Sequence, residues 1–82
     1  MIKPFTVSVP DPVLIDLKDR LARTRWPDSI GKPWDYGTDI TFLRELIDYW
    51  QNHFDPLAAV KRLNLLDHFT TDIDQRALHF IH

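Results

Sequence analysis

The sequence predicts a small, mostly helical α+β domain with three helices, a long aromatic loop and a C-terminal pair of strands. Three observations lead to this fold class. Apolar residues recur at helical spacing in three segments. A stretch that is rich in proline and glycine separates the first two of them. The residues from 69 onward read as two strands around a turn, and 82 residues give room for one small domain.

The first elements are a short extended segment and a helix. Apolar and polar side chains alternate over residues 4–9, which predicts an extended segment. A helix follows, with Asp11 as its N-cap and Pro12 at its first position, where a missing N–H does no harm. Its apolar face is formed by three leucines: Leu14, Leu17 and Leu21. Pro27 disfavours helical backbone at the residue before it, so the helix is expected to end by Arg25.

An irregular loop is expected at residues 27–39, which hold two of the six prolines and both glycines. Trp34 and Tyr36 lie inside this loop and are expected to anchor it to a surface. Asp39 then caps a second helix over residues 40–54. The broad apolar stripe of this helix consists of six residues: Phe42, Leu43, Leu46, Ile47, Trp50 and Phe54.

The last elements are a third helix and a hairpin. Asp55 and Pro56 open the helix, and residues 64–68 close it. Its predicted inner positions are Leu57, Val60 and Leu63. The hairpin occupies residues 69–81 with its turn near Asp74 and Gln75, although this pair is not one of the favoured turn sequences.

Composition excludes several classes of function. The net charge of −2 offers no electrostatic footprint for nucleic acid. The absence of cysteine excludes disulfides and thiolate chemistry. No apolar stretch at the N-terminus is long enough for a signal peptide or a membrane span, so a soluble cytoplasmic protein is expected. The chain is 44% hydrophobic and holds three tryptophans, which suggests more apolar surface than a domain of this size needs.

No group of residues predicts a catalytic or metal site. Asp48 and Tyr49 are adjacent on a helix, so they point apart and cannot act on one atom. Asp35, next to Tyr36, is expected to cap or flank a turn of the loop. The four histidines lack the spacing and partners of zinc ligands. Two aspartates, Asp16 and Asp19, lie among or just before the basic residues of "KDRLARTR", and the helix dipole favours basic residues at this end. Both observations favour a solvated helix end over a phosphate site.

Five stretches of the sequence carry a family resemblance. They are "RLARTRWPD" (20–28), "WDYGTD" (34–39), "FLRELIDYWQNHFD" (42–55), "RLN" (62–64) and "FTTDIDQRALHFIH" (69–82). In this order and at this spacing, the chain resembles the N-terminal region of epoxide hydrolases of the microsomal type, which have the α/β-hydrolase fold. The resemblance extends from Pro4 to His82.

The resemblance implies a role without catalysis. In that family this region wraps the hydrolase core and packs near the lid, and residues like those at 69–82 form the first strands of the main sheet. The His-Gly-x-Pro motif, the aspartate nucleophile, the histidine base and the lid tyrosines come later in the family's chains. The parent reaction converts an epoxide into a vicinal diol through an alkyl-enzyme ester, without a cofactor. The sequence departs from the family pattern at two positions, because Pro56 and Val60 lie near the places where family members usually have a tryptophan and a glutamate. The N-terminal membrane anchor of microsomal members has no counterpart in this sequence, so a soluble bacterial-type relative is the better comparison.

The sequence therefore leaves two functions open. In the first, residues 1–68 are a covering domain and residues 69–82 are the first strands of a truncated hydrolase sheet. In the second, the chain is a stand-alone interaction module that forms homo-oligomers through unpaired strand edges. The suspected interface with a hydrolase core or a partner chain consists of Trp26, Trp34, Tyr36, Trp50 and Phe80. These aromatic residues also fit an ordinary core. No catalytic, cofactor-binding or metal-binding residue is predicted.

Overall fold

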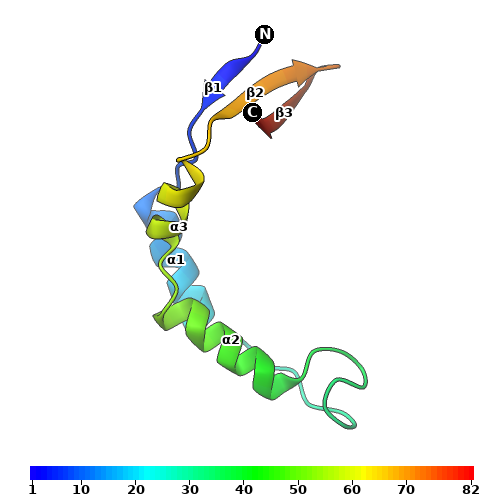
Figure 1. The fold of residues 1–82 in the computed structure, drawn as a ribbon. Helices are drawn as coiled ribbons and strands as arrows, with labels where there is room; N and C mark the ends of the chain where they lie inside the picture. Colours follow the sequence, from blue (N-terminus) through cyan, green and yellow to red (C-terminus); the bar gives the residue numbers. More distant parts are fainter. The chain divides into compact units, whose positions relative to one another are not determined.

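The computed structural model describes all residues from 1 to 82 and confirms the α+β class. The elements in chain order are β1 (Lys3–Phe5), α1 (Asp11–Ala22), α2 (Ile40–Asn52), α3 (Pro56–Leu63), β2 (His68–Ile73) and β3 (Arg76–Ile81) (Figure 1). The chain divides into two compact units, each described by itself below. The helical unit comprises residues 11–54, and the sheet unit comprises residues 1–10 and 55–82.

In the helical unit, α1 begins at Asp11, one residue earlier than predicted. The carboxylate of Asp11 therefore lies in the first turn, where the helix dipole still favours a negative charge. The helix ends at Ala22, and one further turn follows, in which the Arg23 N–H donates to the carbonyls of Asp19 and Arg20 at 3.2 Å. The three predicted inner leucines are half-buried: Leu14, Leu17 and Leu21.

Helix α2 starts where the sequence predicts and ends two residues earlier. The Asp39 carboxylate accepts a hydrogen bond from the Phe42 N–H at 3.3 Å, which confirms the predicted cap. At the other end, the N–H groups of His53 and Phe54 both donate to the carbonyl of Tyr49, at 2.8 and 2.9 Å. This shared acceptor ends the regular helical hydrogen bonding, so Phe54 lies beyond the helix.

Helix α3 is short, and its predicted inner face is partly wrong. Asp55 caps it as predicted, with the Ala58 N–H donating to the carboxylate at 3.1 Å. Val60 is half-buried, but Leu57 and Leu63 are exposed. Periodicity identifies the apolar face of a helix, but another element must cover that face to bury it. Within the sheet unit, no strand packs closely along α3, so its two outer leucines stay exposed.

The sheet has three antiparallel strands in the order β1–β2–β3, so the N-terminal extended segment joins the predicted pair (Figure 1). The hairpin and its turn are confirmed, because Ile73 pairs with Arg76 across a two-residue connection. Asp74 and Gln75 both have positive φ, 50° and 67°, which is the backbone of a type I′ turn. This turn matches the twist of the strands and fixes the register of β2 against β3.

A side chain from the end of α3 holds the chain after β1. The Asn64 amide accepts from the Val7 N–H at 2.9 Å and donates to the Val7 carbonyl at 2.8 Å. Asn64 thus satisfies both backbone groups of Val7 in the way that a neighbouring strand would. Regular pairing ends at Phe5, earlier than the extended segment predicted for residues 4–9.

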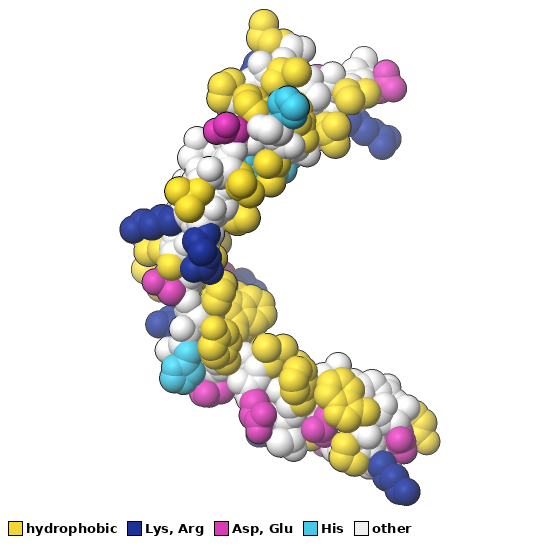
Figure 2. Space-filling model, in the orientation of Figure 1, with side chains coloured by type: hydrophobic (Ala, Val, Ile, Leu, Met, Phe, Trp, Pro, Cys, Tyr) yellow, Lys and Arg dark blue, Asp and Glu magenta, His cyan; other side chains and the backbone are white.

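Hydrophobic side chains remain largely on the surface. No hydrophobic residue is buried, and the one buried residue of the chain is His68, which is 5% exposed. Figure 2 shows hydrophobic side chains gathered on the surface of both units. None of the three helices has the length and the hydrophobicity that a membrane crossing requires.

Candidate functional site

An uncovered apolar surface of the helical unit follows α2. Leu43 and Ile47 are half-buried, and α1 is the element that packs against this helix. Beside them lies an exposed surface, called the α2 stripe below, which consists of Phe42, Leu46 and Trp50 of the predicted apolar stripe together with Tyr49. These four residues follow the spacing of one helix face, so their side chains form a continuous surface.

The loop before α2 extends this surface. The Trp34 ring packs on the Phe42 ring, with 5.3 Å between centroids and 51° between planes. Trp34 has a φ of 70°, a left-handed backbone that bulky residues rarely adopt. The contact with Phe42 helps to hold this strained residue in place. The loop therefore presents Trp34 next to the α2 stripe and anchors it there.

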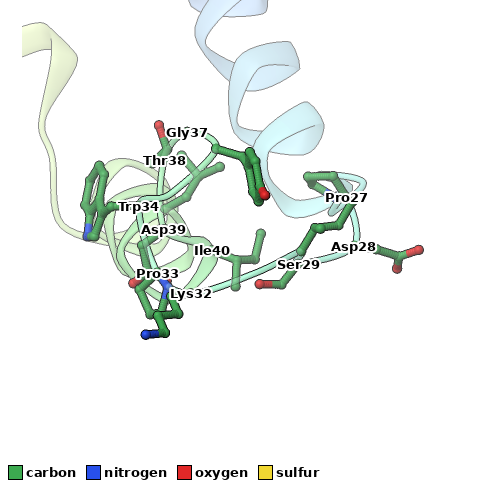
Figure 3. Close-up of a pocket in the computed structure, with 13 residues that line it drawn as sticks. Pro27, Asp28, Ser29, Lys32, Pro33, Trp34, Gly37, Thr38, Asp39 and Ile40 are labelled. Atoms are coloured by element: carbon green, nitrogen blue, oxygen red, sulfur yellow. The ribbon is translucent and has the colours of Figure 1, made fainter.

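An open hollow of about 330 Å³ lies within the same loop. In Figure 3, Trp34 and Pro27 stand on opposite sides of it. Gly31, with a φ of 74°, lies so close to the Tyr36 ring that a Cβ at this position would approach a ring carbon to 2.8 Å. Tyr36 nevertheless stays 83% exposed. The hollow is therefore an open surface feature beside the stripe, with no enclosed ligand cavity.

Both faces of the sheet expose apolar side chains. On one face, Phe69 and Phe80 are cross-strand partners whose rings lie 5.6 Å apart at 27°. On the opposite face, Phe5 packs edge-on against His79 with 5.2 Å between centroids. Leu78 and Ile81 are exposed, one on each face. Sheets with two apolar faces are typical of α/β folds, in which helices cover both sides.

The two edges of the sheet differ. Strand β1 has three residues, and it carries Lys3 and Pro4, which are residue types that discourage further pairing. Strand β3 has six residues, contains no proline and is uncharged from Ala77 to Ile81 apart from the imidazole of His79. Because β2 lies between the other two strands, the outer edge of β3 is unpaired. The sheet is thus protected at one edge and open at the other.

The five suspected interface residues lie in different surroundings. Trp26 is half-buried, and the Arg44 guanidinium lies 5.0 Å from its ring centroid in a cation–π contact. Trp34 is 57% and Trp50 42% exposed, and Tyr36 is almost fully exposed. Phe80 is half-buried against Phe69 and belongs to the sheet unit, whereas the other four belong to the helical unit. Of these residues, Trp34, Tyr36 and Trp50 are the ones with large free surfaces.

The basic residues at the end of α1 are engaged in ion pairs. Arg20 Nε lies 2.8 Å from the Asp16 carboxylate, and Arg23 Nη2 lies 2.6 Å from the Asp19 carboxylate. The hydrogen bond and the charge of Asp19 raise the pKa of Arg23. In each pair the two partners lie one helical turn apart, and both side chains are exposed. The C-terminal end of α1 is therefore a solvated helix end.

The remaining polar candidates are also local contacts. The Asp48 carboxylate accepts from the Asn52 amide at 2.8 Å, and the Tyr49 ring lies near the rings of His53 and Phe54. No three histidine, aspartate or glutamate side chains come together in an arrangement that could hold a metal ion.

Sequence reasoning missed one polar contact of the sheet unit, between His68 and His79. A signal for it was present. A two-residue turn at 74–75 pairs Thr70 with His79, so His68 and His79 lie diagonally on one face.

Comparison with known proteins identifies relatives over nearly the whole chain. Residues 2–82 match the family model described as "Epoxide hydrolase N terminus". A protein of Stigmatella aurantiaca is 37% identical over 82 residues, which cover 99% of this chain and 19% of that protein. Epoxide hydrolase 1 of Sus scrofa is also 37% identical, over 99% of this chain and 18% of its own length. The chain thus spans about a fifth of the length of these curated relatives.

Solved structures give the same result. The juvenile hormone epoxide hydrolase of the silkworm Bombyx mori superposes with a TM-score of 0.87 and 29% identity. The epoxide hydrolase of Aspergillus niger gives the same TM-score and identity. Each alignment covers 99% of this chain and 22% of the solved chain.

Proposed function

The chain belongs to the family of epoxide hydrolase N-terminal domains, and from this premise we propose that it packs on a hydrolase core without taking part in catalysis. The surrounding enzyme would hydrolyse an epoxide to a vicinal diol. The chain would shape and cover the core and support its lid. Its relatives named as epoxide hydrolases are about five times longer, so the reacting groups are assigned to the rest of such an enzyme.

One observation carries this proposal: the chain buries no hydrophobic side chain and exposes a continuous apolar stripe on α2. Burial of apolar surface is the main favourable contribution to folding, at roughly 25 cal/mol per Å². An exposed stripe that holds Leu46, Tyr49 and Trp50 is therefore a surface that gains free energy when a partner covers it. Trp34, held against Phe42, extends the same surface.

The open edge of the sheet supports a specific form of packing. Strand β3 offers an unpaired outer edge along its six residues, whereas Lys3 and Pro4 protect the edge of β1. A core strand that adds to β3 would continue the sheet in one direction only. Helices of the core would then cover the two apolar faces, as in other α/β sheets. In this proposal, residues 69–82 are the first strands of the hydrolase sheet and residues 1–68 are the covering part.

A chimeric enzyme tests the proposed function. The 82-residue chain replaces the matching fifth of the Stigmatella aurantiaca relative, and the same relative without that fifth is the control. We expect the chimera to be soluble and to convert an epoxide into its diol, and the shortened control to aggregate. A chimera that aggregates like the control would contradict the packing role.

Self-association is the second candidate, and the open edge of β3 is the observation that favours it. Two copies could pair through β3 and extend one sheet across a dimer. Sedimentation of the isolated chain distinguishes the two candidates, because a stable dimer with buried β3 amides is expected only from self-pairing. For either candidate we also propose a cytoplasmic location.

A further inference from the structure

The one buried residue of the chain is a histidine that connects three elements of the sheet unit. His68, on β2, lies with its Nε2 atom 2.6 Å from the carbonyl oxygen of Leu63, the last residue of α3. Its Nδ1 atom lies 2.9 Å from Nε2 of His79 on β3. The Leu63 carbonyl also accepts from the Leu66 N–H at 3.1 Å. The His68 ring therefore ties the C-terminal end of α3 to the hairpin.

The partners fix where the protons lie. A carbonyl oxygen can only accept, so Nε2 of His68 must carry a proton. In a neutral imidazole the other nitrogen is then an acceptor, so Nε2 of His79 must donate to Nδ1 of His68. The two ring planes differ by 18°, which is compatible with a hydrogen bond in the plane of both rings. Nδ1 of His79 takes no part in this chain of hydrogen bonds.

We propose that His68, His79 and the Leu63 carbonyl form an acid-sensitive histidine clasp between α3 and the hairpin. One added proton enters at Nδ1 of His79 and leaves every hydrogen bond of the clasp in place. A second proton has to enter at Nδ1 of His68, the atom that accepts the bond. Two N–H groups on two cationic rings would then face each other across 2.9 Å, and the clasp opens.

The surrounding charges do not relieve this conflict. The titratable and charged groups that adjoin the clasp in sequence, or share its sheet face by strand register, are Lys3, Lys61, Arg62, Asp67, Asp72 and His82. The three ion pairs of the chain involve none of these groups and neither ring of the clasp. Three of the six are permanent cations and two are carboxylates, so their sum does not favour a second positive charge.

Proton counting gives the sign of the effect. In the unfolded chain the two rings are separate, so each can take up a proton independently of the other. The hydrogen bonds of the closed clasp have room for only one added proton, so in acid the unfolded state binds one proton more. The stability of the hairpin therefore falls as the pH falls. The equilibrium constant for unfolding of the hairpin rises by up to about tenfold for each pH unit.

NMR of the 82-residue chain between pH 8 and pH 5 tests the proposal. The intensities of folded and unfolded cross peaks of the hairpin amides give the unfolding constant. His79→Gln removes the conflict, because its amide donates to a neutral His68 and its carbonyl accepts from a protonated one. His53→Gln is the matched control on the helical unit.

We expect the wild type and His53→Gln to show the tenfold rise per pH unit, and His79→Gln to change less than twofold. The ¹⁵N shifts of the ring nitrogens at pH 7.5 should show His68 protonated at Nε2. Equal pH dependence in all three proteins, or a proton on Nδ1 of neutral His68, overturns the proposal. A hairpin that gives no folded cross peaks at pH 7.5 also overturns it, because the clasp would then not exist.

Discussion

The turn between β2 and β3 holds two residues with left-handed backbone, and neither is glycine. Asp74 is one of the residue types that tolerate this conformation, but Gln75, with a φ of 67°, is not. The sequence located this turn correctly without the favoured Asn-Gly or Asp-Gly pair. The two strand-like stretches on either side indicated the place of the turn, and the backbone of Gln75 bears the strain.

Replacing Gln75 by glycine is expected to stabilise the hairpin. The left-handed conformation costs an ordinary residue about 1–2 kcal/mol, and glycine loses part of that gain through its extra freedom in the unfolded chain. Gln75→Gly should therefore raise the free energy of unfolding by about 0.5–1 kcal/mol in a urea titration. Gln75→Ala, which keeps a Cβ, is the control and should show no gain. Equal stabilisation by both variants would show that the φ of Gln75 is not the cause.

Asn64 is a residue whose role could not be read from the sequence. Its partner Val7 lies 57 residues away, and local patterns carry no signal for such a contact. The fold makes the contact possible by bringing the end of α3 beside the chain that leaves β1.

Asn64→Ala should lower the free energy of unfolding by about 1–2 kcal/mol, because two hydrogen bonds to backbone are lost. Asn52→Ala is the matched control, because Asn52 makes one exposed bond to Asp48 within its own helix. A loss below about 0.5 kcal/mol is expected there. Hydrogen exchange at Val7 gives a local measurement, and an unchanged Val7 rate in Asn64→Ala would contradict the assigned bond.

At the scale of elements, caps and periodicity predicted the helices well. Asp39 and Asp55 cap α2 and α3 as expected, because capping depends on residues that are adjacent in sequence. Burial was predicted less well. Leu57 and Leu63 are exposed although they lie at apolar helical positions, because the sequence cannot show whether another element covers a face. The pairing of β1 with β2 was missed for the same reason, since it joins distant parts of the chain.

The α2 stripe offers a test at this scale. Leu46→Lys places a charge in the middle of the stripe, whereas Thr41→Lys places the same charge on the polar side of α2. In the Stigmatella chimera we expect Leu46→Lys to reduce soluble, active enzyme at least fivefold, because a lysine in a buried interface must be desolvated. Thr41→Lys should leave the yield within twofold. Equal yields would show that the core does not cover this helix face.

At the scale of the molecule, the chain combines well-formed local structure with hydrophobic side chains of which none is fully buried. Caps, ion pairs and a two-residue turn define its helices and hairpin, and the α2 stripe and both sheet faces remain exposed. Such a chain gains most of its burial from a partner. The family to which it belongs supplies a candidate partner in the hydrolase core of its longer relatives.

Oxidative footprinting of aromatic side chains, in the isolated chain and in the chimera, tests most directly whether a hydrolase core covers the apolar surface. We predict that Trp34, Tyr49 and Trp50 react readily in the isolated chain and at least fivefold more slowly in the chimera. Tyr49 and Trp50 report on α2, and Trp34 reports on the loop beside it. If these three residues react equally fast in both proteins, the hydrolase core does not cover the apolar surface, and the central claim is wrong.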